Sequence, residues 1–160
     1  MKLLIHDANI LIDLIKTESI GQFFSLNYEM ITTLAVIEEL NDDQQIIIAE
    51  LRESSRLKIR SISEKEDEII EGLLTQYPAI SYPDCTVFYS AQSIQATLLT
   101  GDKKLRNCAE EKGIDVRGIF WIFDEMLEQK KISRTDYKGK LAKLEMINRR
   151  LPKEEFDKRK

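Results

Sequence analysis

Short apolar runs alternate with longer amphipathic segments through residues 2–117, and this alternation limits the chain to few folds. The runs typical of buried strands are Lys2–His6, Met30–Thr33, Leu57–Ile62, Thr97–Thr100 and Ile114–Arg117. A stretch with helical spacing of its apolar side chains follows each of them. Strands that alternate with helices indicate a parallel sheet covered on both faces. We therefore predict an α/β fold with a central parallel sheet.

The helical segments carry local start and stop signals. Asn9 is expected to cap a helix that runs to about Leu26. The helix after the second strand is expected to break near residues 41–43. Ser63 and Glu66 have the spacing of a capping box, which predicts the start of another helix.

The composition is typical of a globular protein. The chain has 160 residues, of which 42% are hydrophobic and 32% charged, enough for one domain with a core. Its apolar runs are much shorter than the ~20 residues of a membrane helix, and the N-terminus lacks a signal-peptide pattern. The two cysteines, Cys85 and Cys108, have no metal-ligand spacing. We expect reduced thiols in a cytoplasmic protein.

Charge is distributed unevenly along the chain. Residues 1–128 contain 12 basic and 23 acidic residues, so they carry −11, whereas residues 129–160 contain 12 basic and 5 acidic residues and carry +7. We interpret the first part as the main domain and the second as a basic helical C-terminal extension packed on it. The tail either attracts a polyanion such as RNA or is simply a solvated helical hairpin.

Asp7, Asp84 and Asp102 stand near strand ends or helix starts, and Glu38 and Glu39 lie in the predicted helix after the second strand. The carboxyl ends of parallel strands share one edge, where ligands bind in sheets of this kind, so positions 7, 84 and 102 are expected to converge. Glu39 borders the buried stripe of its helix, whereas Glu38 points further toward solvent. We therefore choose Glu39 as the fourth member.

Such a cluster has both a chemical and a structural interpretation. Clustered carboxylates repel one another unless a cation neutralises them, and Mg²⁺ or Mn²⁺ prefers oxygen ligands. Singly, Asp102 can cap its helix and Asp84 can favour a helix dipole. Asp7 is harder to explain structurally, because capping there is assigned to Asn9. His6, the only histidine, is expected to face away from Asp7 into the core.

The order and spacing of four stretches resemble the acidic motifs of PIN-domain ribonucleases. These stretches are IHDANILIDL, TTLAVIEEL, YPDCTVFYSAQ and LLTGDKKLRNCAEEKGI. The resemblance spans about residues 3–125, and the C-terminal part is similar to the toxin-like VapC branch. It implies a three-layer α/β/α sandwich that holds Mg²⁺ or Mn²⁺ and cleaves single-stranded RNA with a metal-activated water. It also implies frequent homodimers and an inhibitory antitoxin partner, as in type II toxin–antitoxin pairs.

The resemblance also implies residue roles. The four acids would be the catalytic metal ligands, directly or through water, and Asn9 and Thr100 would orient them. Candidates for RNA phosphate contacts are Lys103, Lys104, Arg134, Lys138, Arg149 and Arg150.

Two alternative functions remain open on the sequence alone. A receiver-type phosphoryl-transfer protein also clusters acids around Mg²⁺, but here the third strand runs into Ser and Glu rather than Asp. A non-catalytic RNA- or partner-binding module would use the +7 tail.

Overall fold

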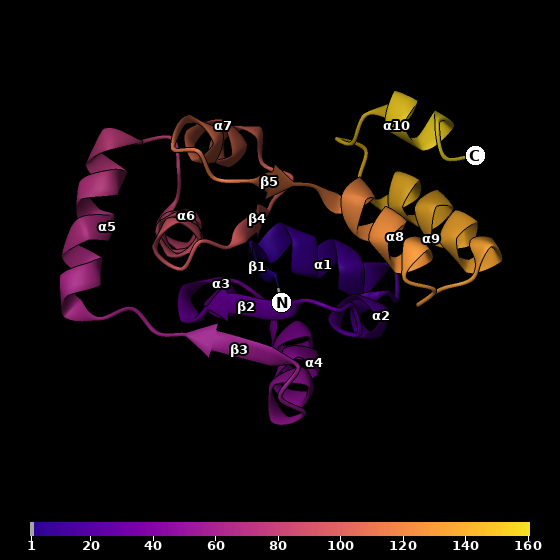
Figure 1. Cartoon of the computed structure of the whole chain (residues 1–160), viewed down its shortest axis with the longest axis horizontal. Helices are drawn as coiled ribbons and strands as arrows, with labels where there is room; N and C mark the ends of the chain where they lie inside the picture. The colour runs from indigo at the N-terminus through magenta and orange to yellow at the C-terminus, as the bar shows by residue number, and fades with distance from the viewer. Residues whose placement is uncertain (1) are drawn as a thin grey trace.

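A five-stranded parallel sheet forms the centre of the protein in the computed structural model, which describes residues 2–160 (Figure 1). The strand order is β3-β2-β1-β4-β5. The strands are β1 (Leu3–His6), β2 (Glu29–Thr33), β3 (Leu57–Arg60), β4 (Thr97–Leu99) and β5 (Val116–Arg117). In the register, Leu4 of β1 lies between Met30 and Thr97 on its two neighbours. The predicted α/β class with a parallel sheet is confirmed.

Helices cover both faces of this sheet. They are α1 (Ala8–Lys16), α2 (Ile20–Phe24), α3 (Leu34–Glu38), α4 (Asp42–Glu53), α5 (Glu64–Gln76), α6 (Tyr82–Ser93), α7 (Lys103–Glu111), α8 (Ile119–Glu128), α9 (Arg134–Ile147) and α10 (Lys153–Asp157). The chain runs outward from β1 through β2 to β3, then returns to β4 and β5 on the other side of β1. Right-handed crossovers therefore place α1 and α4 on one face and α6 and α7 on the other. The three-layer α/β/α sandwich is confirmed.

The core lies on both faces of the central strands. Leu4, Ile5 and Leu98 have no exposed surface, and neither have Phe88 of α6 and Phe123 of α8. Aromatic side chains of this size contribute most to core energetics. Strands buried on both faces explain why the sequence shows continuous apolar runs rather than alternation.

One predicted helix is divided. The segment expected to be helical from Asn9 to about Leu26 forms α1 and α2 instead. Between them, Thr17 Oγ1 donates a hydrogen bond to the carbonyl oxygen of Asp13 at 2.8 Å, and Glu18 adopts a positive φ of 55°. Hydroxyl side chains compete for helix carbonyls, so the first helix ends there.

Two predicted helix starts are confirmed. Asn41 and Gln44 form a capping box at the start of α4, which produces the predicted break. Ser63 and Glu66 form a second box at the start of α5, where each side chain accepts a hydrogen bond from the other residue's backbone N–H.

The Ser63 cap gives a prediction for stability. We expect Ser63→Ala to lower the free energy of unfolding by about 1 kcal/mol, because a backbone N–H of α5 loses its acceptor. Urea unfolding followed by circular dichroism measures the loss. Ser61→Ala is the matched control, because Ser61 is exposed and lies before the cap. Equal stability of the two variants would contradict the prediction.

The basic C-terminal helices pack on the rest of the chain. α9 lies against α1 and α8, and α10 lies against α9 (Figure 1). Arg159 after α10 forms an ion pair with Asp124 of α8 at 2.8 Å. A domain boundary at residues 128 and 129 stays a prediction. Among residues 2–160, no helix combines the length and the apolar character needed to cross a membrane.

Candidate active site

Asp7 lies where the chain passes from β1 into α1. Its Oδ1 accepts a hydrogen bond from the backbone N–H of Ile10 at 3.0 Å, and its Oδ2 accepts one from the hydroxyl of Thr100 at 2.5 Å. The residue is only 2% exposed. The strand order reverses between β1 and β4, and ligands bind at such switch points in open α/β sheets. Asp7 is therefore a buried acid at the edge where a ligand is expected.

The prediction that Asn9 caps α1 is wrong, because Asp7 is the N-cap. The backbone of Asp7 is extended, with φ −84° and ψ 176°, which aims its carboxylate at the free amide of the first turn. Asn9 is instead an exposed residue of α1. Asp7 therefore also has a structural role as a helix cap, but the cap uses only one of its two carboxylate oxygens.

Thr100 connects two of the candidate acids. Its hydroxyl donates to Asp7 Oδ2 and accepts a hydrogen bond from the backbone N–H of Asp102 at 3.0 Å. Asp102 caps α7, as the sequence suggests, because its Oδ1 accepts from the backbone N–H groups of Lys104 and Leu105. This arrangement supports the predicted orienting role of Thr100.

Asp84 lies in the first turn of α6. The hydroxyl of Ser81 caps this helix by accepting a hydrogen bond from the backbone N–H of Asp84 at 3.3 Å. The cap therefore comes from Ser81, and the half-buried Asp84 carboxylate is not needed for it.

The pKa values show that the acids influence one another. The pKa of Asp7 is raised from 3.8 to about 7, mainly by burial and also by the charges of Asp84 and Asp102, although the hydrogen bonds from Thr100 and Ile10 lower it. Burial likewise raises the pKa of Asp84 to about 6, with contributions from Asp102 and Glu39.

Glu39, rather than Glu38, belongs to this group. The charge of Glu39 raises the pKa of Asp84, whereas that of Glu38 acts on Tyr82. Burial also raises the pKa of Glu39 itself. The choice of Glu39 from the sequence is therefore consistent with the electrostatics of the site, although Glu39 remains the most exposed of the four acids.

The four acids have no basic partner in the described part of the chain. Ion pairs among residues 2–160 involve none of Asp7, Glu39, Asp84 and Asp102. Within the same residues, no three histidine, cysteine, aspartate or glutamate side chains are already positioned as ligands of one metal ion. Mg²⁺ usually keeps several waters and binds through one or two carboxylates, so an all-protein cage is not required. The all-oxygen donor set fits such an ion.

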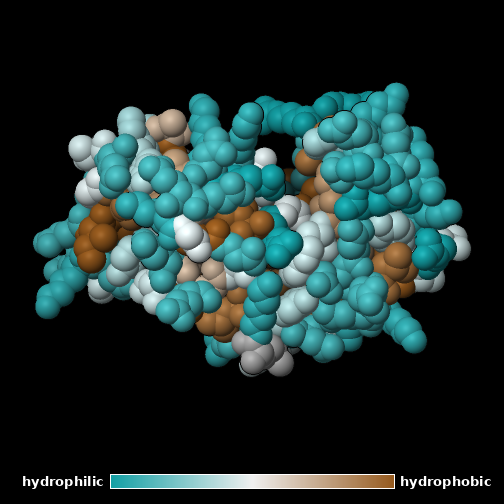
Figure 2. All heavy atoms as spheres, turned by 45° about the horizontal axis from the view of Figure 1, so that its top comes forward, coloured by the Kyte–Doolittle hydropathy of each residue, from teal (hydrophilic) through white to brown (hydrophobic). Residues whose placement is uncertain are grey.

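A groove of about 590 Å³ opens beside Asp102, the one of the four acids that lines it. Asn9, Asp102, Lys103 and Lys104 line one side of it, and the turn at residues 147–151 contributes to the other. Figure 2 turns the α7 and α10 side of the molecule toward the viewer and shows the surface hollowed between its two halves, with hydrophilic residues around the opening. The groove is wide enough to admit a ligand larger than a metal ion.

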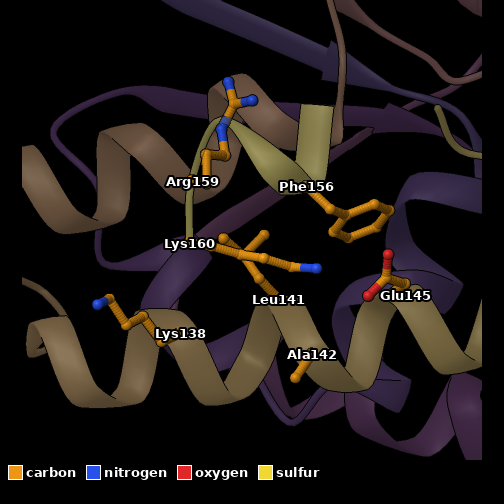
Figure 3. A pocket seen from close by; sticks show the side chains of 7 residues that line it. All are labelled: Lys138, Leu141, Ala142, Glu145, Phe156, Arg159 and Lys160. Atoms are coloured by element: carbon orange, nitrogen blue, oxygen red, sulfur yellow. The ribbon is translucent and has the colours of Figure 1, made fainter. Parts of the chain in front are cut away.

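The predicted RNA contacts do not share one groove. Lys103 and Lys104 lie at the groove with Asp102. Lys138 instead borders a different groove between α9 and α10, which Leu141 and Phe156 also line (Figure 3). Arg134 is at the start of α9 and lines neither groove.

Arg150 lines the same groove as Asp102, Lys103 and Lys104. Its neighbour Arg149 instead lines a separate pocket with Lys153. Both arginines were candidates on the sequence, and their spacing gave no means of choosing between them. Two of the apolar residues that line the groove, Ile119 and Ile147, carried no sequence signal beyond their places in amphipathic helices.

His6 has the predicted core position. It has no exposed surface, and its ring contacts Phe23 and Phe24 edge-on with centroids 5.6 and 5.9 Å away. Neither ring nitrogen has a hydrogen-bond partner in the described chain. Burial lowers the pKa of His6 to about 3, so the ring is neutral at physiological pH. It takes no part in the acidic cluster.

An α/β sandwich with acidic residues where its strand order reverses belongs to a class of folds that bind ligands at that point. Comparison with known proteins identifies the family. The chain matches the family model described as "DUF3368: PIN domain" over residues 3–159. The protein belongs to the PIN-domain family, whose members are generally nucleases. This membership weakens the receiver-type alternative.

A solved structure shares the fold. One chain in the crystal structure of VapBC2 from Rickettsia felis bound to a DNA fragment from their promoter is 18% identical, with 72% of this chain and 98% of that chain covered and a TM-score of 0.52. A PilT N-terminus domain protein from the archaeon Sulfolobus solfataricus P2 is 14% identical, with 79% and 94% covered and a TM-score of 0.45. A search of curated proteins found no match.

Proposed function

We propose that the protein is a metal-dependent endoribonuclease that cleaves phosphodiester bonds of single-stranded RNA. One observation carries the proposal: Asp7 is 2% exposed, and the charges of Asp84 and Asp102 act on it without a basic partner among residues 2–160. A buried acid among like charges is costly, and a divalent cation is the ligand that removes the cost. Acids with strongly raised pKa values, as Asp7 and Asp84 have, are typical of functional sites.

The chain's own residues would divide the work. Asp7, Glu39, Asp84 and Asp102 would hold Mg²⁺ or Mn²⁺, which when bound would polarise a phosphoryl oxygen and lower the pKa of a water, so that the resulting hydroxide could attack the phosphorus. The Thr100 hydroxyl fixes the orientation of Asp7 and the backbone of Asp102. Asn9 lines the same groove, where its exposed amide can hydrogen-bond a water or a substrate oxygen.

The proposal includes partners. We propose a homodimer in the cytoplasm that an antitoxin inhibits, as the family resemblance implies. The shared fold with a chain of the VapBC2 structure supports this part. Size-exclusion chromatography with light scattering tests the dimer, and co-purification with the product of a neighbouring small gene tests the antitoxin.

A cleavage assay tests the nuclease itself. The full chain is incubated with a labelled single-stranded RNA in Mn²⁺, in Mg²⁺ and in EDTA, and with duplex RNA as the control substrate. We expect cleavage of the single strand with either metal, none in EDTA, and recovery when Mn²⁺ is restored. Salt-sensitive binding without cleavage in any metal would select the non-catalytic RNA-binding module instead.

A further inference from the structure

The turn between α9 and α10 comes from the basic extension, yet it lies across the groove from Asp102. Ile147, Asn148, Arg150 and Leu151 line the same groove as Asp102. The extension therefore contributes directly to the candidate active site, although α8 separates it in the sequence from the last strand, β5.

A hydrogen bond holds this turn in place. Asn148 Nδ2 donates to Asp13 Oδ2 on α1 at 2.9 Å. Asn148 Oδ1 in turn accepts the backbone N–H of Arg150 at 3.2 Å, and the Asn148 carbonyl accepts the backbone N–H of Leu151 at 3.4 Å. The turn is thus tied to the same helix that Asp7 caps, so its position relative to the acids is fixed.

The turn brings two kinds of side chain into the groove. Arg150 is exposed, and the ion pairs among residues 2–160 do not include it, so its charge is available to a ligand. Ile147 is apolar but 38% exposed, and the half-buried Leu151 lies beside it in the groove. A cation beside exposed apolar surface suits a ligand that combines a phosphate with a flat apolar face.

We infer that residues 147–151 form the substrate-binding wall of the active site, in which Arg150 binds a backbone phosphate of single-stranded RNA and Ile147 contacts a base. The inference rests on the proposed function and names the residues that bind its RNA substrate. A paired base hides its faces in the stack, whereas an unpaired base offers them to apolar side chains. The guanidinium can bind a phosphate with two hydrogen bonds.

Binding of RNA without turnover tests the inference. A fluorescent single-stranded RNA is titrated with the full chain in Ca²⁺, and its anisotropy is measured over a range of salt concentrations. We expect Arg150→Ala to weaken binding about tenfold and to lower the slope of log affinity against log salt by about 0.7. The matched control is Arg149→Ala, because Arg149 is equally exposed but lines the separate pocket. Arg150→Lys keeps the charge and is expected to restore the slope.

The apolar contact has its own readout. We expect Ile147→Ala to weaken binding severalfold without changing the salt slope, because no charge is lost. Met146→Ala is the control, since Met146 is 70% exposed and is not part of the groove lining. Thermal unfolding of each variant shows that it is folded before binding is compared.

The outcomes separate this inference from the proposed function. If Mn²⁺-dependent cleavage occurs but Arg150→Ala and Arg149→Ala bind RNA alike, the inference is wrong and the nuclease assignment stands. If Arg150 and Ile147 govern binding but no metal supports cleavage, the nuclease assignment is wrong and the wall remains a binding surface. Equal binding of single-stranded DNA with the same dependence on Arg150 would overturn the assignment to RNA.

Discussion

Asp7→Asn is expected to slow RNA cleavage by at least about 100-fold and, at the same time, to stabilise the metal-free protein at pH 8. A bound metal ion supplies several kcal/mol of transition-state stabilisation, and each 1.36 kcal/mol is a factor of ten in rate. Asparagine keeps an oxygen for the backbone N–H of Ile10, so the cap survives while the charge is lost. Activity and stability should therefore change in opposite directions.

The stability change follows from the pKa of Asp7. The folded value of about 7 lies above the ordinary 3.8, so between these pH values the folded protein holds a proton that the unfolded chain has released. Stability from this group is present below about pH 4 and is lost as pH rises to about 7. The loss has an upper bound of about 4 kcal/mol, from 1.36 kcal/mol per pH unit.

Urea unfolding in EDTA measures this change. At pH 8 we expect a higher midpoint for Asp7→Asn than for the wild type, and at pH 4 nearly equal midpoints. The control is Asp43→Asn, which removes an exposed acid from the first turn of α4 and leaves the candidate site unchanged. Normal cleavage by Asp7→Asn would remove Asp7 from the catalytic group, and an unchanged midpoint at pH 8 would show that its charge is already neutralised.

The second large expected effect is the loss of folding stability that His6 causes at acidic pH. Its pH dependence is opposite to that of Asp7. The folded pKa of about 3 lies below the ordinary 6.5, so on acidification the unfolded chain takes up a proton that the folded protein excludes. Stability from this group is present above about pH 6.5 and is lost as pH falls toward 3. At pH 4.5 the loss amounts to about 3 kcal/mol.

His6→Leu should remove this acid sensitivity. Leucine fits the apolar site between Phe23 and Phe24 and leaves no unpartnered ring nitrogens there. We expect the urea midpoint of the variant, measured in EDTA, to fall less than that of the wild type between pH 7 and pH 4.5. Parallel losses in both proteins would mean that the ring is hydrated or hydrogen-bonded in solution.

The sequence predicted the strands and the acids because both depend on local pattern. Runs such as Leu3–Ile5 are continuously apolar because their strands are buried on both faces. Asp7 directly follows β1 and Asp102 lies three residues after the end of β4, and parallel strands present their carboxyl ends at one edge, so convergence could be expected without coordinates.

The wrong cap came from a choice between two neighbouring residues, whereas the placement of the basic residues depends on contacts distant in sequence. Nothing local distinguishes Asn9 from Asp7 as the cap, because either side chain can reach a free amide. The groove wall depends on the hydrogen bond between Asn148 and Asp13, which are 135 residues apart. The separation of Arg150 from Lys138 follows from that contact, so charge counting alone could not show which basic residues lie near the acids.

The adjacent residues His6 and Asp7 also disfavour a shifted register of β1 in the sheet. Successive residues in this segment face opposite environments, with an imidazole packed on aromatic rings and a carboxylate at the acidic edge. Sliding β1 by a single residue past its neighbours would exchange the two, bringing a negative charge among the phenylalanines. The acid proposed for chemistry thereby helps to select the one strand pairing on which that chemistry depends.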